Sequence, residues 1–142
     1  MNPVYLLDTN VISEFSKPIP NMHLLEKARM REDICAISST VWQETVRGYE
    51  SMPEGKRKQK IFTYIQKIKE LYTIIPYDSF AAQICGELQA RCTKNGKTLA
   101  RYASQIAATA IANGMVLITH NTADYEALCE NSMLKIEDWW EE

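Results

Sequence analysis

Four short apolar runs recur along this 142-residue chain, and each is followed by a stretch long enough to form at least one helix. They lie at residues 4–7, 34–37, 73–75 and 115–118. Unbroken apolar runs of this length are typical of strands that are buried on both faces of a parallel sheet. The alternation predicts an α/β fold in which a central parallel sheet of four to five strands is flanked by helices on both faces, with residues 133–136 as the candidate edge strand.

Composition narrows the class of protein further. No linker, repeat or low-complexity stretch interrupts the sequence, so we expect residues 1–142 to form a single domain. The formal net charge of −2 argues against a protein that holds nucleic acid by bulk electrostatics, so any such contact must come from a local patch. The four cysteines lack zinc-ligand spacing, and no apolar run approaches the ~20 residues that span a bilayer. We therefore expect reduced thiols and a cytoplasmic protein without membrane contact.

Two helical stretches in the middle of the chain carry apolar side chains at helical spacing. The first covers about residues 56–71, and we expect its core stripe to consist of Ile61, Phe62, Ile65, Ile68 and Leu71. The second begins at Asp78 or Ser79 and runs past Cys92, and we expect its inward side chains to be Ala82, Ile84, Cys85 and Leu88.

Polar side chains follow the predicted strands at the points where the strands end. Asp8 follows the first strand, residues 119–124 follow the last, and Ser38 follows the second with Glu44 about two helical turns later. Since the carboxyl ends of parallel strands lie at one edge of the sheet, we expect Asp8, Glu44 and Asp124 to meet there. Each also has a simpler interpretation, as a helix cap, a solvated side chain and a first-turn acid respectively.

A cluster of carboxylates without compensating bases repels itself unless a cation is bound. Oxygen ligands of this kind suit Mg²⁺ or Mn²⁺ and not Zn²⁺. The chemistry that such a site supports is hydrolysis of a phosphodiester, and nearby Thr9, Ser38, Thr119 and Asn121 are candidates for orienting the acids or a water molecule.

Several segments, in order along nearly the whole chain, resemble PIN domains, specifically VapC toxins and their FitB-like relatives. The segments are LLDTNVIS at residues 6–13, SSTVWQETVRG at 38–48, residues 76–88, QIAATA at 105–110 and THNTADY at 119–125. The resemblance implies a PIN-like fold and a Mg²⁺- or Mn²⁺-dependent endoribonuclease that is the toxin of a type II toxin–antitoxin system. It assigns the catalytic and metal-binding roles to Asp8, Glu44 and Asp124.

The resemblance also implies partners. Such toxins form homodimers and are held inactive by a small antitoxin protein that carries a DNA-binding module. Their substrates are structured RNAs, transfer RNA or ribosomal RNA. Four basic residues flank the proposed site and are expected to contact RNA phosphates: Arg91, Lys94, Lys97 and Arg101.

One position departs from the family pattern D-x-x-I-A-A-T-A, because Ala103 stands where the third acidic residue is expected. A methyl group cannot coordinate a metal or orient water, so we expect an inactive or severely impaired enzyme with weak divalent-metal binding. Two origins are open: an engineered Asp→Ala exchange that allows a toxic protein to be produced, which we favour, and natural drift. The alternative function is a non-catalytic FitB-like subunit that regulates transcription together with a DNA-binding partner.

Overall fold

A parallel five-stranded sheet forms the centre of the molecule in the computed structural model, which describes residues 2–140. The strand order is β3-β2-β1-β4-β5, and every neighbouring pair is parallel. The strands are β1 (Tyr5–Leu7), β2 (Cys35–Ser38), β3 (Thr73–Ile75), β4 (Val116–Ile118) and β5 (Ile136–Glu137). The predicted α/β fold with a central parallel sheet is confirmed, although the edge strand begins only at Ile136.

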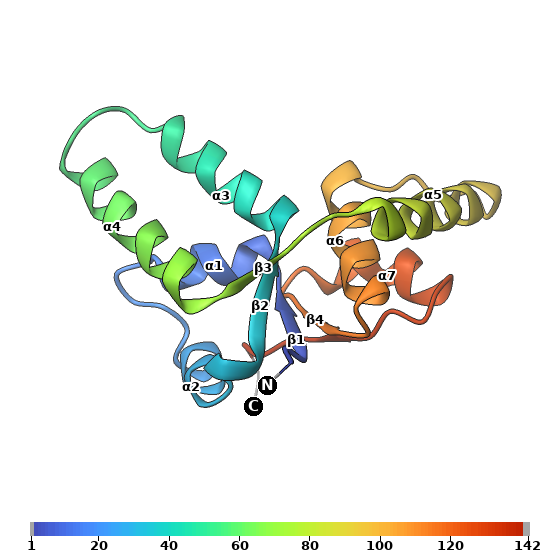
Figure 1. Ribbon diagram of the computed structural model, residues 1–142, viewed down its shortest axis with the longest axis horizontal. Coiled ribbons are helices and arrows are strands. Elements are labelled where there is room, and N and C mark those ends of the chain that lie inside the picture. The colour runs from blue at the N-terminus through green and yellow to red at the C-terminus, as the bar shows by residue number, and fades with distance from the viewer. Residues whose placement is uncertain (1, 141–142) are drawn as a thin grey trace.

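Seven α-helices within the described residues surround this sheet, and they fall into two groups (Figure 1). They are α1 (Thr9–Phe15), α2 (Met22–Met30), α3 (Ser39–Glu50), α4 (Lys56–Leu71), α5 (Ser79–Lys94), α6 (Arg101–Ala112) and α7 (Thr122–Glu130). In Figure 1, α1 to α4 lie to the left of the strands, and α5 to α7 lie to the right. The most extensive contact between helices joins α5 to α6, and α3 also contacts α6. None of the helices between residues 2 and 140 combines the length and apolar character that crossing a bilayer requires.

Local sequence explains where the helices begin and end. Ser38 caps α3 by accepting a hydrogen bond from the backbone N–H of Val41, and Asp78 caps α5 in the same way through Ala81. Both are residue types whose short oxygen-bearing side chains satisfy the unpaired N–H groups of a first helical turn. After α6 the chain turns at Gly114, whose φ of 63° lies in the left-handed region that favours glycine.

Most apolar side chains of the three central strands are buried, because helices cover both faces of the sheet. The core strands contribute Leu6, Leu7, Ala36, Ile37, Leu117 and Ile118. All four cysteines are free thiols, with Cys35, Cys85 and Cys92 buried and Cys129 partly exposed.

Two predicted inward faces were partly wrong. On α4, Phe62 and Leu71 are 47% and 43% exposed, because α4 packs chiefly on α3 at the outer edge of the molecule. Phe62 there meets the ring of Tyr49, with 5.8 Å between the ring centroids. On α5, Ala82 is exposed and its neighbour Ala81 is buried. The reason is that the buried face of α5 follows positions 81, 85, 88 and 92, a regular helical stripe.

The strand order places a crevice at a defined point. From β1 the chain first adds β2 and β3 on one side of the sheet, and it then returns to the other side of β1 to add β4 and β5. The strand order therefore reverses at β1. Leu7 and Ile118, the last residues of β1 and β4, are paired, and the next backbone N–H, that of Asp8, donates to the carbonyl of Ile118 at 2.9 Å. In open α/β sheets the ligand site lies outside the carboxyl ends of the strands at such a switch point.

Candidate active site

Asp8 lies at the switch point and is only 5% exposed. Its Oδ1 accepts from the backbone N–H of Thr9 at 2.8 Å, so the side chain is also the N-cap of α1. Its Oδ2 accepts from Asn10 Nδ2 at 3.1 Å and from the hydroxyl of Thr119 at 2.8 Å. Burial raises the pKa of this carboxyl above its ordinary value, while the hydrogen bonds from Thr119, Thr9 and Asn10 act in the opposite direction. Both interpretations of Asp8 therefore apply, since one residue caps the helix and faces the crevice.

Glu44 approaches the same place from α3. The hydroxyl of Thr9 donates to Glu44 Oε1 at 3.0 Å, while the backbone N–H of the same threonine binds Asp8. Thr9 thus links two carboxylates that are 36 positions apart in the chain. Glu44 is half-buried, so the expectation of a fully solvated side chain does not describe it.

Asp124 lies in the first turn of α7, and its side chain is exposed. Its backbone N–H donates to the carbonyl of Asn121 at 3.1 Å. The next residue, Tyr125, is buried in the wall of the cleft, and its hydroxyl acts on Asp8 to lower the pKa of that carboxyl. Burial and the nearby charge of Asp8 raise the pKa of Tyr125, which therefore stays protonated and able to donate.

These residues line one open cleft of about 1030 Å³. Asp8, Glu44 and Asp124 all contribute to its wall, and Ala103 of α6 lines it as well. Ala103 is partly buried and packs against the hydrophobic core, so its methyl group lies where the sequence pattern expects a carboxylate. The fold brings all four positions to the same cleft.

The donor set fits a divalent cation in a restricted way. Among residues 2–140, no three Asp, Glu, His or Cys side chains are grouped closely enough to hold a metal ion between them. Asp8 and Glu44 nevertheless offer two carboxylates that are tied to the same threonine. Since Mg²⁺ commonly keeps several water ligands and binds through one or two carboxylates, this pair fits a largely hydrated ion and not a closed cage.

The four orienting candidates have different positions. Thr9 and Asn121 line the cleft, and Thr9 forms hydrogen bonds with both Asp8 and Glu44. Thr119 is fully buried behind Asp8, where its hydroxyl donates to Asp8 and accepts from Asn10 Nδ2 at 3.0 Å. Ser38 does not line the cleft, since it is buried and caps α3.

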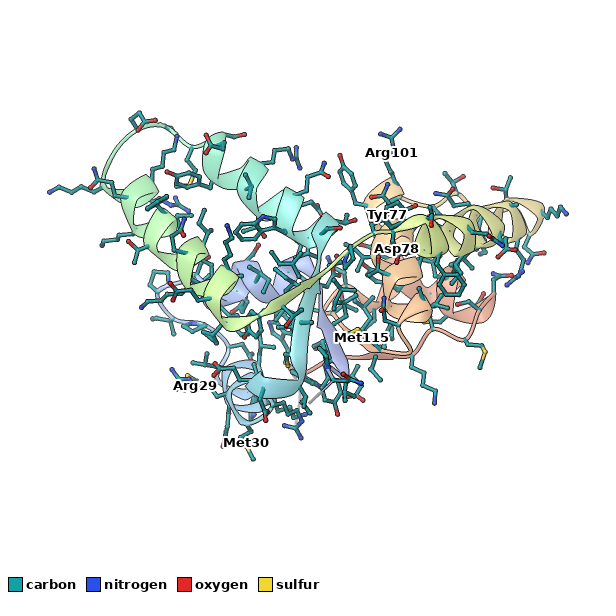
Figure 2. The ribbon with its side chains drawn as sticks, in the orientation of Figure 1. Arg29, Met30, Tyr77, Asp78, Arg101 and Met115 are labelled. Atoms are coloured by element: carbon teal, nitrogen blue, oxygen red, sulfur yellow. The ribbon has the colours of Figure 1, made fainter. Side chains whose placement is uncertain are left out.

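The four basic candidates are spread along one side of the molecule. Arg101 lines the cleft at the start of α6 and projects outward there (Figure 2). Lys97 lines a neighbouring hollow together with Asp124. Arg91 and Lys94 lie at the far end of α5, where Arg91 donates to the carbonyl of Asn131. The structure therefore places one of the four in the cleft and one beside it.

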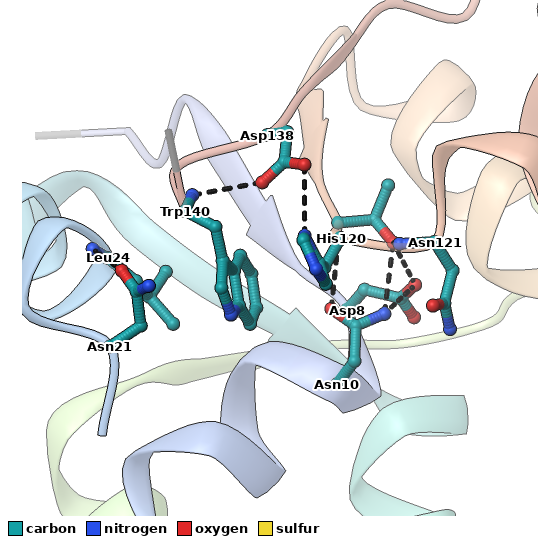
Figure 3. A network of polar contacts seen from close by, with 9 residues as sticks. Asp8, Asn10, Asn21, Leu24, His120, Asn121, Asp138 and Trp140 are labelled. Atoms are coloured by element: carbon teal, nitrogen blue, oxygen red, sulfur yellow. Dashed lines mark hydrogen bonds and ion pairs between the residues drawn. The ribbon is translucent and has the colours of Figure 1, made fainter. Parts of the chain in front are cut away.

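Sequence reasoning missed two groups in the cleft. Asn10 bridges Asp8, Thr119 and the backbone N–H of His120, and its place directly after Thr9 in the first polar cluster was the available signal. Figure 3 shows the second group, in which the Trp140 ring lies against His120 at the side of the cleft. Nothing in the sequence position of Trp140 pointed to the cleft.

Comparison with known proteins agrees with this architecture. The PIN domain family model matches residues 5–130. VapC ribonuclease Y4jK of Sinorhizobium fredii is 34% identical over 128 residues, which cover 86% of this chain and 90% of that protein. Toxin FitB of Neisseria gonorrhoeae is 32% identical over 127 residues, covering 86% and 91% of the two chains.

Solved structures give the same result. The crystal structure of FitAcB from Neisseria gonorrhoeae superposes with a TM-score of 0.88 at 26% identity and covers 98% of this chain and 100% of that one. A structure of FitAB bound to an IR36 DNA fragment superposes with a TM-score of 0.87 at 27% identity, covering 98% and 97%. The PIN domain model matches most of this chain, and the two relatives named above align with it over about nine-tenths of their own length. The chain is therefore a member of the PIN domain family, with VapC ribonucleases and the FitB toxin among its relatives.

Proposed function

We propose that this chain is the toxin of a type II toxin–antitoxin system, built as a divalent-metal-dependent endoribonuclease and disabled in this form by Ala103. The observation that carries the proposal is the single cleft lined by Asp8, Glu44, Asp124 and Ala103. The ribonuclease activity named for the VapC relative supports the reaction class.

The chain's own residues supply most of the geometry that the reaction needs. Three donors, from Thr9, Asn10 and Thr119, fix the Asp8 carboxylate, and the Thr9 hydroxyl sets the position of Glu44 beside it. A pre-oriented pair of carboxylates does not have to reorganise when charge develops at the reacting phosphate. When bound, Mg²⁺ or Mn²⁺ would supply an activated water and would stabilise the developing negative charge.

Because position 103 is alanine, the cleft lacks the third acidic residue that the family pattern places on α6. Without a carboxylate on α6, nothing at this position holds the cation or orients the attacking water from that side of the cleft. Loss of such a group commonly lowers the rate by orders of magnitude. The absence of any group of three metal-binding side chains within residues 2–140 supports weak metal binding in the present form.

The partners follow from the same family. We propose a small antitoxin with a DNA-binding module, a homodimeric toxin, a structured RNA substrate such as transfer RNA or ribosomal RNA, and a cytoplasmic location. The FitAB complex on DNA supports a partner of this kind, because this chain closely resembles the FitB structures.

Restoring the acid tests the proposal. Ala103→Asp, purified with Mg²⁺ or Mn²⁺ and incubated with total cellular RNA, is expected to cut RNA, and EDTA is expected to stop it. The matched control is Ala103→Asn, which has the same size but no charge and is expected to remain inactive, like the chain with Ala103. If Ala103→Asp cuts no RNA while it stays folded and dimeric, the nuclease proposal is wrong.

A second function remains open because of Ala103 itself. A FitB-like subunit that acts with a DNA-binding partner in transcriptional regulation needs no third acid. Growth arrest on expression of Ala103→Asp, but not of the chain with Ala103, would favour the toxin. Equal growth of both, combined with partner-dependent DNA binding, would favour the regulator. The genomic codon for residue 103 decides whether the alanine is natural.

A further inference from the structure

Two aromatic rings are stacked in the wall of the cleft. The imidazole of His120 and the indole of Trp140 lie with centroids 4.5 Å apart and planes inclined by 19°. Both residues line the cleft (Figure 3). The His120 side chain is half exposed, and Trp140 is partly exposed. A face or edge of this pair is therefore accessible from the cleft.

The pair is held in place by specific contacts. Asp138 Oδ2 lies 3.0 Å from His120 Nδ1, and Asp138 Oδ1 accepts from the backbone N–H of Trp140 at 2.9 Å. The backbone N–H of His120 donates to Asn10 Oδ1 at 3.0 Å, and the amide of Asn10 donates to Asp8. One chain of hydrogen bonds thus fixes the stacked rings relative to the catalytic carboxylate.

Packing of this segment against the body of the molecule does not explain why Trp140 stacks on His120, because the neighbouring Trp139 already provides that packing. Trp139 is 2% exposed, meets Tyr5 edge-to-face at 5.0 Å, and has the guanidinium of Arg31 5.6 Å from its ring. Trp140 instead faces the cleft, with Ile19 and Pro20 also in the lining. Ile19 is 87% exposed, so its side chain is accessible from the cleft.

The charge of the cleft favours contacts with RNA bases over contacts with RNA phosphates. Four acids line it, Asp8, Glu44 and Asp124 together with Glu14, against two bases, Lys17 and Arg101. Lys17 is moreover paired with Glu14 at 2.8 Å. A groove of this charge attracts a phosphate backbone weakly, so most of the affinity for a strand must come from contacts with bases.

We propose that His120 and Trp140 form a base-stacking subsite that takes one unpaired nucleobase of the RNA, next to the phosphate that lies at the acids. This subsite rests on the proposed function and makes it more specific. It requires a substrate with a splayed base in a loop, bulge or single strand near the cleavage point. Proteins recognise RNA in this way by stacking unpaired bases on aromatic side chains.

Binding in EDTA tests the subsite without cleavage. The probe is a short, fluorescently labelled, single-stranded oligoribonucleotide of mixed sequence, followed by a set in which one position at a time is abasic. The proteins are the chain with Ala103 and its variants Trp140→Leu, His120→Ala and His120→Phe, with Phe80→Leu as the control. Phe80 is an exposed aromatic residue on α5 that does not line the cleft.

The expected result is that one abasic position weakens binding by the parent chain. Trp140→Leu and His120→Ala should each bind about five- to a hundredfold more weakly, because stacking on one aromatic side chain supplies that much affinity per base. Both should also lose the sensitivity to the abasic position. His120→Phe, which keeps a flat ring and loses the contact with Asp138, should retain most of the binding, and Phe80→Leu should behave like the parent.

Unchanged affinity in both Trp140→Leu and His120→Ala would overturn the subsite, and so would variants that remain sensitive to the same abasic position. If Trp140→Leu does not fold, the comparison of His120→Ala with His120→Phe decides, since His120 is half exposed. Failure of the subsite is distinguishable from failure of the proposed function. If Ala103→Asp cleaves RNA while the ring variants bind normally, only the subsite is wrong; if no protein binds or cuts RNA, both are.

Discussion

Thr119→Val is the sharpest probe of how the fold holds Asp8. The two side chains have nearly the same shape, so the change removes a hydroxyl and leaves packing intact. That hydroxyl is fully buried, donates to Asp8 Oδ2 at 2.8 Å, and accepts from Asn10 Nδ2 at 3.0 Å and from the backbone N–H of Asn121 at 3.1 Å. The change withdraws one hydrogen bond from a charged group and leaves two donors without this acceptor. We expect the free energy of unfolding at neutral pH to fall by about 3 kcal/mol.

The loss should depend on pH in a defined direction. Burial raises the folded-state pKa of Asp8 above 3.8. The favourable contribution of protonated Asp8 is therefore fully present below that value and is lost as pH rises through the folded-state pKa. Because donation from Thr119 lowers the pKa of Asp8, removing the hydroxyl raises it further. The difference in stability between Thr119→Val and the parent should thus be largest at neutral pH and should shrink on acidification.

Guanidinium unfolding, followed by tryptophan fluorescence at neutral pH and at pH ~4, measures both effects. The matched control is Thr109→Val, another fully buried threonine, whose hydroxyl donates only to the carbonyl of Gln105 one helical turn earlier. We expect that control to lose about 1 kcal/mol or less, independent of pH. Equal losses in the two variants, with no pH dependence in either, would refute the view that Thr119 supports a charged Asp8.

Two further predictions concern glycines and thiols. Gly86 lies in the middle of α5, and a methyl group added there meets no atom within 4 Å beyond its chain neighbours and its own helix backbone. Gly86→Ala should therefore stabilise the protein by about 0.5–1 kcal/mol, whereas Gly114→Ala at a φ of 63° should destabilise it by about 1 kcal/mol. Thermal unfolding of the pair checks this, and a shift of the same sign in both would contradict it. Among the four thiols, Cys129 should react first with a thiol reagent at mildly alkaline pH, because it alone is partly exposed, while burial keeps Cys35 protonated with a pKa of about 12. Peptide mapping by mass spectrometry identifies the modified residue, and early labelling of Cys35 would show that the core opens more readily than the structure implies.

Much of the fold follows from the sequence because its signals are local. The apolar runs mark strands that are covered on both faces, and Ser38 and Asp78 mark helix starts by the hydrogen bonds that their side chains can make. The meeting of Asp8 with Glu44 follows from one further rule, that parallel strands end at the same edge.

What the sequence could not provide depends on contacts between distant segments. Phe62 has the spacing of a core residue and is exposed, because α4 packs chiefly on α3 and leaves this side chain at the outer edge of the molecule. Trp139 and Trp140 are identical neighbours, yet one is buried and the other lines the cleft, since Trp139 packs on Tyr5 whereas Trp140 stacks on His120. Periodicity carries no information about such long-range partners.

The location of Ala103 on α6 has a consequence for how this protein changes over time. Asp8 caps a helix and anchors three donors, so replacing it disturbs the frame along with the chemistry. Ala103 caps no helix; it is a partly buried residue of α6 that lines the cleft. Exchange of this residue through a single codon can therefore change the acidity of the cleft while the cap of α1 and the hydrogen bonds that hold Asp8 stay in place.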